Sequence, residues 1–362
     1  MLGRRRMTRV ALPPLNMLAV DFAASLFRLT AGDVEADDVE SSYVFRVADL
    51  GKFGAKLGAF AERADKVLGR FYNLLGGFFV RRDCGVETVQ ALAKSAAGST
   101  DAILRQLSAV REETGAGNVE VLWGEGPFVK NPPPLLQSVE FMEGVRTWPA
   151  VQFDAEGSGA KTKVRSGFRR AARPSCAVLG ALALGASATY VAGGQRQGVI
   201  RFLIPLSFVE YDAVAAGMLG RLGALGVCDL PEPLARLIVA ALAGRPAVFK
   251  LVDIVYTGGI EVERDSSKEL AIDTRSLGRH LHRLRDYAHI LLGLAERWCR
   301  CEREGWPEEC GDVGRAGAVA ARIYLYAETG RLEHAYEALG ALLRLSRDAA
   351  GDLTRLVEDL IW

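Results

Sequence analysis

A dense basic segment is the part of this sequence best suited to bind an anionic polymer. Residues 161–173 read KTKVRSGFRRAAR and contain six Lys and Arg residues with no Asp or Glu. Such side chains neutralise phosphates and make binding salt-dependent, and an aromatic ring among them offers single-stranded bases a stacking surface. We predict a nucleic-acid-binding surface made of Lys161, Lys163, Arg165, Phe168, Arg169, Arg170, Arg173 and Arg196. The alternative is a solvated basic loop without a specific partner.

A second group of reactive side chains lies in residues 275–289, RSLGRHLHRLRDYAH, which hold three of the four histidines. Arg275 and His280 are spaced R-x4-H, and Arg283 and His289 are spaced R-x5-H. These spacings resemble those of the HEPN ribonuclease family, in which a helical dimer brings Arg and His together at an RNA phosphodiester. There His acts as acid or base, and Arg stabilises charge on the phosphate. The alternative, which the abundance of Arg favours, is a basic helical face without catalysis.

The cysteines are scattered along the chain, at positions 84, 176, 228, 299, 301 and 310. This is too sparse for a disulfide framework in a chain of 362 residues, so we expect a reducing compartment and free or redox-paired thiols. Cys299, Cys301 and Cys310 lack both the C-x2-4-C spacing and the fourth ligand of a structural zinc site. We predict no metal and no cofactor.

Motifs of the common catalytic sites are missing from the sequence. The chain has no G-x4-G-K-[ST] loop, no G-x-S-x-G elbow, no H-E-x-x-H pair, and no G-x-G-x-x-G after a predicted strand. The formal net charge is +1, so an anionic partner must be attracted by local clustering of charge. We predict that the protein is not an enzyme.

Periodicity predicts the elements that position these residues. Apolar spacings of three and four predict helices, and β-branched runs predict strands. Helices are expected over 51–75, 86–113 and 231–243, strands over 42–51, 118–124, 198–208 and 247–259, a solvated acidic loop over 32–42, and a helical hairpin over 321–343. No strand signal follows Asp273. The predicted fold class is α+β, with a mixed domain over residues 1–268 and an all-helical domain over 269–362.

An uncharged run of 19 residues, 176–194, follows the basic segment and leads through a Gly-Gly turn into the strand predicted at 198–208. Its length is that of a membrane span, but its composition is mostly Ala and Gly, which contribute little transfer free energy. We predict a helix of small residues that packs closely in a soluble core. Pro13, Pro14, Asn16 and Asp21 interrupt the N-terminal apolar residues, so we expect no signal peptide, no membrane partner and a cytoplasmic location.

Three stretches follow the basic segment in order: CAVLGALALGASATYVAGGQRQGVIRFLIPL, PEPLARLIVAALAGRPAVFKLVDIVYTGG and AARIYLYAETGRLEHAYEALGALLRL. Their order and texture resemble the large-subunit family of archaeal type I-A CRISPR effector (Cascade) complexes, over roughly residues 165–362. The resemblance implies a non-catalytic DNA- and RNA-binding subunit in antiviral defence, whose partners are CRISPR RNA, target DNA and other subunits. Such a subunit would help recognise target DNA and recruit the nuclease-helicase.

Overall fold

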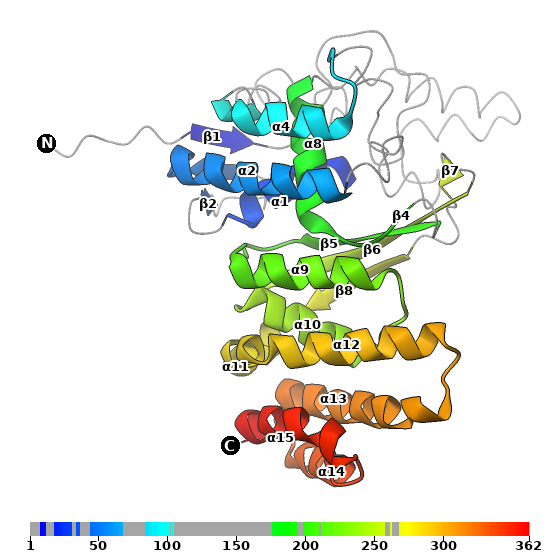
Figure 1. Cartoon of the computed structure of the whole chain (residues 1–362). Coiled ribbons are helices and arrows are strands. Elements are labelled where there is room, and N and C mark those ends of the chain that lie inside the picture. The colour runs from blue at the N-terminus through cyan, green and yellow to red at the C-terminus, as the bar shows by residue number, and fades with distance from the viewer. Residues whose placement is uncertain are drawn as a thin grey trace, which may run out of the picture. The chain divides into compact units, whose positions relative to one another are not determined.

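The computed structural model shows a chain of helices and strands that divides into two compact units. The first unit comprises Met1–Tyr190, Gly194–Phe208 and Val252–Lys268, and the second comprises Val191–Gly193, Val209–Leu251 and Glu269–Trp362. The predicted α+β class is confirmed (Figure 1). The predicted domain boundary between residues 268 and 269 stays a prediction. The structure describes residues 8–11, 18–30, 34–36, 44–67, 84–101, 103–104, 176–194, 198–209, 211–257, 261–262 and 268–361.

A small sheet forms in the first unit from β1 (Thr8–Ala11), β2 (Val34–Ala36) and β3 (Val44–Val47). Its order is β1-β3-β2, and both neighbouring pairs are antiparallel. The expectation of a solvated loop over 32–42 was therefore wrong for residues 34–36. Backbone hydrogen bonding to β3 outweighs the acidic composition of this stretch.

Four helices form the core of the first unit: α1 (Leu18–Arg28), α2 (Leu50–Val67), α4 (Val89–Gly98) and α8 (Cys176–Thr189). Helix α8 packs against the other three. The ring of Phe27 lies between two other rings, with centroids 4.8 Å from Phe45 and 5.3 Å from Phe53. The helix predicted over 51–75 is confirmed where the chain is described. The helix predicted over 86–113 is shorter: α4 begins at Val89 and ends at Gly98, with Ser99 as its C-cap, and residues 100, 101, 103 and 104 are helical again. The strand predicted over 118–124 lies outside the described residues.

Small residues let α8 approach its neighbours closely, as the sequence predicted. A Cβ atom added to Gly185 would lie 2.2 Å from the carbonyl oxygen of Phe22, and one added to Gly180 would lie 2.3 Å from the Cβ of Ala96. The Ser187 hydroxyl donates to the carbonyl oxygen of Phe60 at 3.1 Å. Every residue from 180 to 189 is buried. The backbone of α8 is thus fixed against both α1 and α4.

The apolar run does not continue as a helix, because residues 190–194 form the strand β4 (Tyr190–Gly194). The larger sheet has the order β4-β5-β6-β7, and β8 pairs with β6. The other strands are β5 (Val199–Pro205), β6 (Val248–Thr257), β7 (Glu261–Val262) and β8 (Lys268–Asp273). The predicted strands over 198–208 and 247–259 are confirmed. The change of unit falls within β6, between Leu251 and Val252.

The second unit is built around α10 (Glu232–Ala243), whose residues 237–243 are all buried. Pro231 caps its start, and Gly244, at φ +62°, caps its end in the left-handed conformation. The helices that surround it are α9 (Ala213–Leu225), α11 (Leu281–Asp286), α12 (Ala288–Arg303) and α13 (Gly311–Thr329). Two further helices, α14 (Leu332–Leu342) and α15 (Arg347–Ile361), pack on α13.

Only helices follow Asp273 in the described chain, in agreement with the sequence. They include two short 3-10 helices, η6 (Arg275–His280) and η7 (Glu308–Cys310). Helices α13 and α14 form the predicted helical hairpin, and Gly330, at φ +70°, makes the turn between them. A residue with a side chain is strained at such a φ, so glycine fits this position.

Candidate nucleic-acid interface

The residues predicted to bind nucleic acid lie outside the described chain, so the interface stays a prediction. They are Lys161, Lys163, Arg165, Phe168, Arg169, Arg170, Arg173 and Arg196. In the sequence, the basic segment ends three residues before α8, and Arg196 lies between β4 and β5. The described elements next to this candidate interface are therefore α8, β4 and β5.

A cation on the described strands is already paired within the fold. Arg201, on β5, donates from Nε and Nη2 to the two carboxylate oxygens of Asp253 on β6, both at 2.7 Å. The two side chains are only 16% and 15% exposed. This bidentate, largely buried ion pair joins β5 to β6 in the first unit, and its geometry is that of a structural contact.

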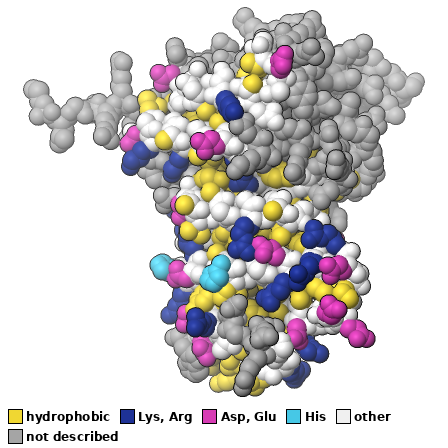
Figure 2. Space-filling view, in the orientation of Figure 1, with side chains coloured by type: hydrophobic (Ala, Val, Ile, Leu, Met, Phe, Trp, Pro, Cys, Tyr) yellow, Lys and Arg dark blue, Asp and Glu magenta, His cyan; other side chains and the backbone are white. Residues whose placement is uncertain are grey.

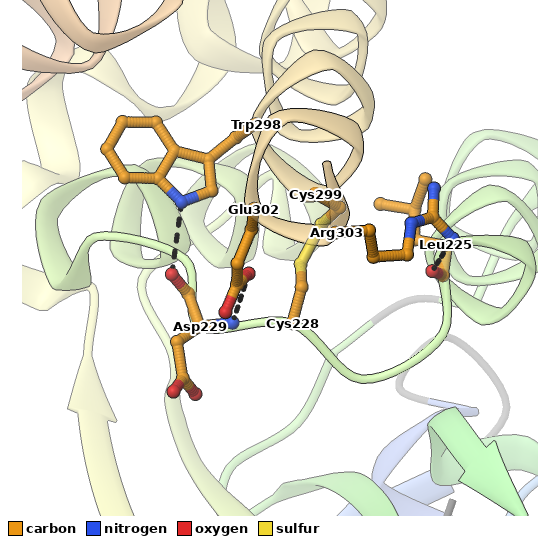
Figure 3. Close-up of a disulfide and its surroundings, with 7 residues drawn as sticks. All are labelled: Leu225, Cys228, Asp229, Trp298, Cys299, Glu302 and Arg303. Atoms are coloured by element: carbon orange, nitrogen blue, oxygen red, sulfur yellow. Dashed lines mark hydrogen bonds between the residues drawn. A yellow bond between two sulfur atoms is a disulfide. The ribbon is translucent and has the colours of Figure 1, made fainter. Parts of the chain in front are cut away.

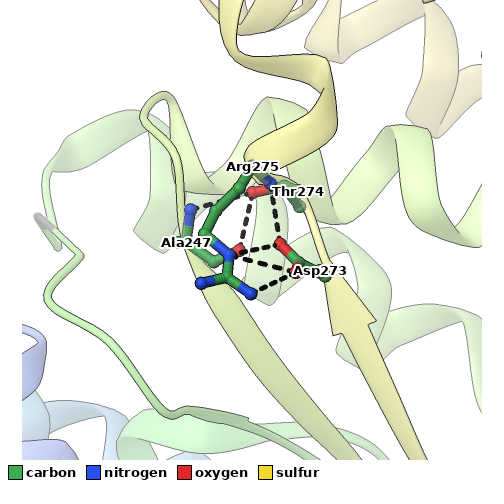
Figure 4. Close-up of polar contacts among 4 residues, drawn as sticks. All are labelled: Ala247, Asp273, Thr274 and Arg275. Atoms are coloured by element: carbon green, nitrogen blue, oxygen red, sulfur yellow. Dashed lines mark hydrogen bonds and ion pairs between the residues drawn. The ribbon is translucent and has the colours of Figure 1, made fainter. Parts of the chain in front are cut away.

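Arg275, a residue of the first Arg-His pair, is held by the residue at the end of β8. Its guanidinium binds Asp273 with Nη2 2.6 Å from Oδ2, and its backbone N–H donates to Oδ1 at 2.9 Å (Figure 4). The hydrogen bond from Arg275 is the main reason why the pKa of Asp273 lies below its usual value. This contact joins the first residue of η6 to the last residue of β8, where the chain passes from the sheet to the helices.

Thr274 fixes the same junction from the buried side. Its hydroxyl donates to the carbonyl oxygen of Ala247 at 2.9 Å and accepts from the N–H of Ala247 at 3.1 Å (Figure 4). Its own N–H donates to the same carbonyl at 2.9 Å. The side chain is fully buried. Sequence reasoning missed this residue, because its partner is 27 residues away and no local pattern connects them.

His280, the histidine of the first Arg-His pair, is buried in the second unit. It is 5% exposed, and its Nε2 accepts a hydrogen bond from Nε of Arg279 at 2.8 Å. Burial, followed by the charges of Arg279 and Arg283, lowers the pKa of His280 below its usual value. The imidazole is therefore neutral at pH 7, and one of its nitrogens is occupied.

In the second Arg-His pair, the arginine is held by a contact within the fold. Arg283 donates to the backbone carbonyl of Asp359, on α15, and Tyr287 binds the carboxylate of the same residue. This hydrogen bond raises the pKa of Tyr287. His289 is exposed on α12. Among the described residues, the hydrogen bonds of Arg275, His280 and Arg283 thus go to groups other than their predicted partners.

The cysteines of the second unit are joined in disulfides, so the expectation that they are too sparse for a disulfide framework was wrong. Of the two alternatives, free or redox-paired thiols, the structure has paired sulfurs. One disulfide connects Cys228 to Cys299, which are 71 residues apart in the sequence (Figure 3). The other connects Cys301 to Cys310, which are 9 residues apart. The cysteines are sparse along the sequence, but the fold brings the partners together. The two Cα atoms lie 5.5 Å apart in the first disulfide and 5.8 Å apart in the second. Cys84 is disulfide-bonded as well.

Hydrogen bonds on either side reinforce the disulfide between Cys228 and Cys299, which closes the longer loop of the two. Nε1 of Trp298 donates to the carbonyl oxygen of Asp229 at 3.1 Å, and Glu302 accepts from the Asp229 N–H at 3.0 Å (Figure 3). Arg303 donates to the carbonyl oxygen of Leu225 at 3.3 Å. Helix α12 is therefore tied by the disulfide and two hydrogen bonds to the connection between α9 and α10, and by a third hydrogen bond to the last residue of α9.

Another contact that the sequence did not predict joins α11 to α9. Asp212 caps α9 by accepting from the N–H of Ala215 at 2.9 Å, and its other carboxylate oxygen binds Arg285. Arg285 also lies against Gly244, where an added Cβ atom would meet its guanidinium. The Asp–x–x–Ala pattern gives a signal for the helix cap, but none for the arginine 73 residues away.

No helix in the described part of the chain combines the length and apolar character of a membrane span. His, Cys, Asp and Glu side chains among these residues form no group of three suited to a metal ion. Comparison of the chain with protein-family models, with curated proteins and with solved structures finds no match.

Proposed function

We propose that this chain is a non-catalytic nucleic-acid-binding subunit of a CRISPR RNA-guided antiviral surveillance complex, of the archaeal type I-A large-subunit kind. The basic segment 161–173 and Arg196 would contact CRISPR RNA or target DNA, and other surfaces would contact the remaining subunits. The protein would help recognise target DNA and recruit the nuclease-helicase.

The observation that carries this proposal is the distribution of charge. Residues 161–173 hold six cations without an acid, whereas residues 275–361 hold thirteen arginines against fourteen acidic residues. The helical region therefore has no excess of positive charge to attract a polyanion. The proposal therefore assigns the affinity for nucleic acid to the basic segment, the largest acid-free cluster of cations in the sequence, which leads into the buried helix α8.

The contacts of the Arg-His segment support the non-catalytic part of the proposal. A general acid or base works best with a pKa near the operating pH and with access to substrate. His280 is buried and has a lowered pKa, and Arg275 and Arg283 bind Asp273 and a backbone carbonyl of α15. These side chains serve the packing of the second unit.

A cytoplasmic location is part of the proposal. The disulfides agree with this location if the protein comes from a hyperthermophilic archaeon. Disulfides are rare in the cytosol of mesophiles but common inside hyperthermophilic archaea. An archaeal source is what the resemblance to the type I-A family implies. An intracellular protein of such an organism would keep the two disulfides of the second unit as stabilising links.

Salt-dependent binding tests the proposal. Affinity for a fluorescent single-stranded oligonucleotide is measured by anisotropy at several salt concentrations. Replacing Arg165, Arg169 and Arg170 with Ala should lower the slope of log K against log salt by about 2, at about 0.7 for each phosphate that is no longer neutralised. The matched control replaces Arg300, Arg315 and Arg331, which also removes three charges, and should leave the slope unchanged. Equal slopes for the two triple variants would refute the proposed interface.

The ribonuclease alternative is tested separately. A variant that combines His280→Ala and His289→Ala should lose RNA cleavage if the chain is a HEPN-type enzyme. We expect the purified wild-type protein to cleave no RNA. Turnover that disappears in this variant, but persists in a variant with a similar loss of stability at Thr274, would overturn the non-catalytic assignment.

A further inference from the structure

Helix α14 presents an apolar stripe that the described part of the chain leaves exposed. Leu332 is 58% exposed, Tyr336 is 68% exposed and Leu343, at the C-terminal cap of the helix, is 86% exposed. These three are the most exposed large hydrophobic residues in the described part of the chain. We refer to Leu332, Tyr336 and Leu343 as the α14 stripe.

The α14 stripe is separate from the face of the helix that packs in the core. At about 100° per residue, the three residues lie within an arc of about 40°. The buried residues Ala335, Ala338 and Leu342 are centred roughly 100° farther round the helix, and α13 and α15 pack on α14. The apolar arc of α14 is thus about 160° wide, more than the ~100° that a single packed face requires. Figure 2 shows hydrophobic side chains at the surface in the region where Figure 1 places α14.

Charges along the edge of the stripe indicate what covers it. Glu333 lies in the first turn of α14, and Arg344 lies in the turn that follows the C-terminal cap, Leu343. When the helix path is continued to Arg344, the two residues fall on the same side of the stripe, about 16 Å apart along the axis. Glu333 is 63% exposed and its only ion pair with an arginine among the described residues is a 3.5 Å contact with Arg331. One end of the edge is therefore acidic and the other end basic.

We propose that the α14 stripe binds the α14 stripe of a second copy of this chain, in antiparallel orientation. A two-fold axis at the middle of the stripe, beside Leu339 and Gly340, places Glu333 opposite the partner's Arg344, and this pair forms twice. Leu332 then faces the partner's Leu343. A parallel pairing would instead place like charges opposite each other, so the charge pattern selects the antiparallel arrangement.

The middle of the stripe is also self-complementary. In the same register Tyr336 faces the partner's Gly340. A Cβ atom added to Gly340 would meet nothing within 4 Å, so the space beside this glycine is open. The ring of Tyr336 can therefore lie flat over the partner's helix backbone, and the two helices can approach closely. Apolar, aromatic and charged groups thus all match their counterparts in one register.

The first test is the mass of the intact protein in solution. Sedimentation velocity is run from about 1 to 500 µM, because a patch of this size gives weak association. We expect dimerisation that Tyr336→Glu and Leu343→Glu each abolish. The control is Val214→Glu, which places the same charge on another exposed apolar residue, 43% exposed on α9. A wild-type protein that stays monomeric throughout, or equal effects of all three variants, overturns the proposal.

Charge exchange tests the register. Glu333→Arg and Arg344→Glu should each weaken the dimer by roughly tenfold or more, because each places like charges opposite each other twice. The combined variant should return the dissociation constant to within a few-fold of the wild type. If the combined variant is as weak as the single ones, the two residues do not face each other and the antiparallel register is wrong.

Crosslinking tests the direction independently of affinity. Leu339→Cys lies beside the two-fold axis and should form a disulfide-linked dimer with itself. Leu332→Cys should not, but a mixture of Leu332→Cys and Leu343→Cys should crosslink. Efficient self-crosslinking of Leu332→Cys would indicate a parallel pair and overturn the proposal. If Tyr336→Glu releases a different subunit from a purified assembly while the wild-type chain alone is monomeric, that subunit covers the stripe and the second copy does not.

Discussion

Removing the disulfide between Cys228 and Cys299 should destabilise the second unit more than removing the one between Cys301 and Cys310. A disulfide constrains the unfolded chain by closing a loop, and the entropic effect grows with loop length. With separations of 71 and 9 residues, the chain-entropy relation gives about 4.4 and about 2.6 kcal/mol. Against a typical free energy of unfolding of about 5–15 kcal/mol, either loss is large.

The comparison is made between two matched double variants, Cys228→Ala/Cys299→Ala and Cys301→Ala/Cys310→Ala. Each removes two buried sulfur atoms, so the cavities that they leave largely cancel in the comparison. Urea unfolding is followed by tryptophan fluorescence, for which Trp298, next to Cys299, is a local probe. We expect the free energy of unfolding to fall more in the first variant, by about 2 kcal/mol.

Two results would refute this reasoning. If the denatured, unreduced wild-type protein is alkylated at Cys228 and Cys299, then these residues carry free thiols and the disulfide does not exist. If the two variants lose equal free energy, or the second loses more, then loop closure is not the main contribution. Wild-type protein unfolded in a reducing agent should lose at least as much free energy as either double variant.

Three further predictions concern the buried contacts. The free energy of unfolding should fall as the pH drops through about 6.5, because the unfolded chain protonates at His280 before the folded chain does; His280→Gln should flatten this dependence in urea titrations, and nuclear magnetic resonance should give a pKa below the usual value. Gly185→Ala should cost about 1–3 kcal/mol because its Cβ would clash with the backbone of α1, whereas Gly58→Ala, with open space around the added atom, should be neutral or slightly stabilising in thermal denaturation. Thr274→Val should cost about 1–3 kcal/mol by leaving the buried N–H of Ala247 without its hydroxyl acceptor, and amide exchange at Ala247 should accelerate; unchanged exchange would count against this role.

Local sequence patterns predicted the elements in which the residues' own structural preferences match the element that the fold contains. The helix α10 follows from Pro231 and Gly244 at its ends, and β6 follows from a β-branched apolar run. The close packing of α8 follows from its Ala and Gly content, since only small side chains permit the contact at Gly185. The apolar pattern did not separate α8 from β4, because periodicity cannot distinguish a buried strand from a buried helix over five residues.

Helix α9 shows why other elements were missed. Gly217 and Gly220 lower the helix propensity of residues 213–225, and the segment lacks a clear polar face. Its start is fixed by Asp212, and α10 and α12 pack against it. Long-range packing therefore outweighs the weak local preference. The disulfide between Cys228 and Cys299 was missed for a related reason, because 71 residues separate its two ends.

The arginines of the candidate interface and those of the helical unit are expected to have different roles, one in binding and the other in stability. In the helical unit, each of Arg275, Arg283 and Arg285 binds a carboxylate or a carbonyl of another residue, so replacing one of them removes a structural contact. The basic segment 161–173, in contrast, contains six cations and no acidic residue of its own. A triple replacement at Arg165, Arg169 and Arg170 should therefore change salt-dependent binding while leaving the unfolding midpoint unchanged. A replacement at Arg285 should do the reverse, because Asp212 would lose the partner that joins α9 to α11. Measuring both quantities for both variants separates a binding role from a structural one, and a fall in the unfolding midpoint of the triple variant would place the basic segment in the folded core.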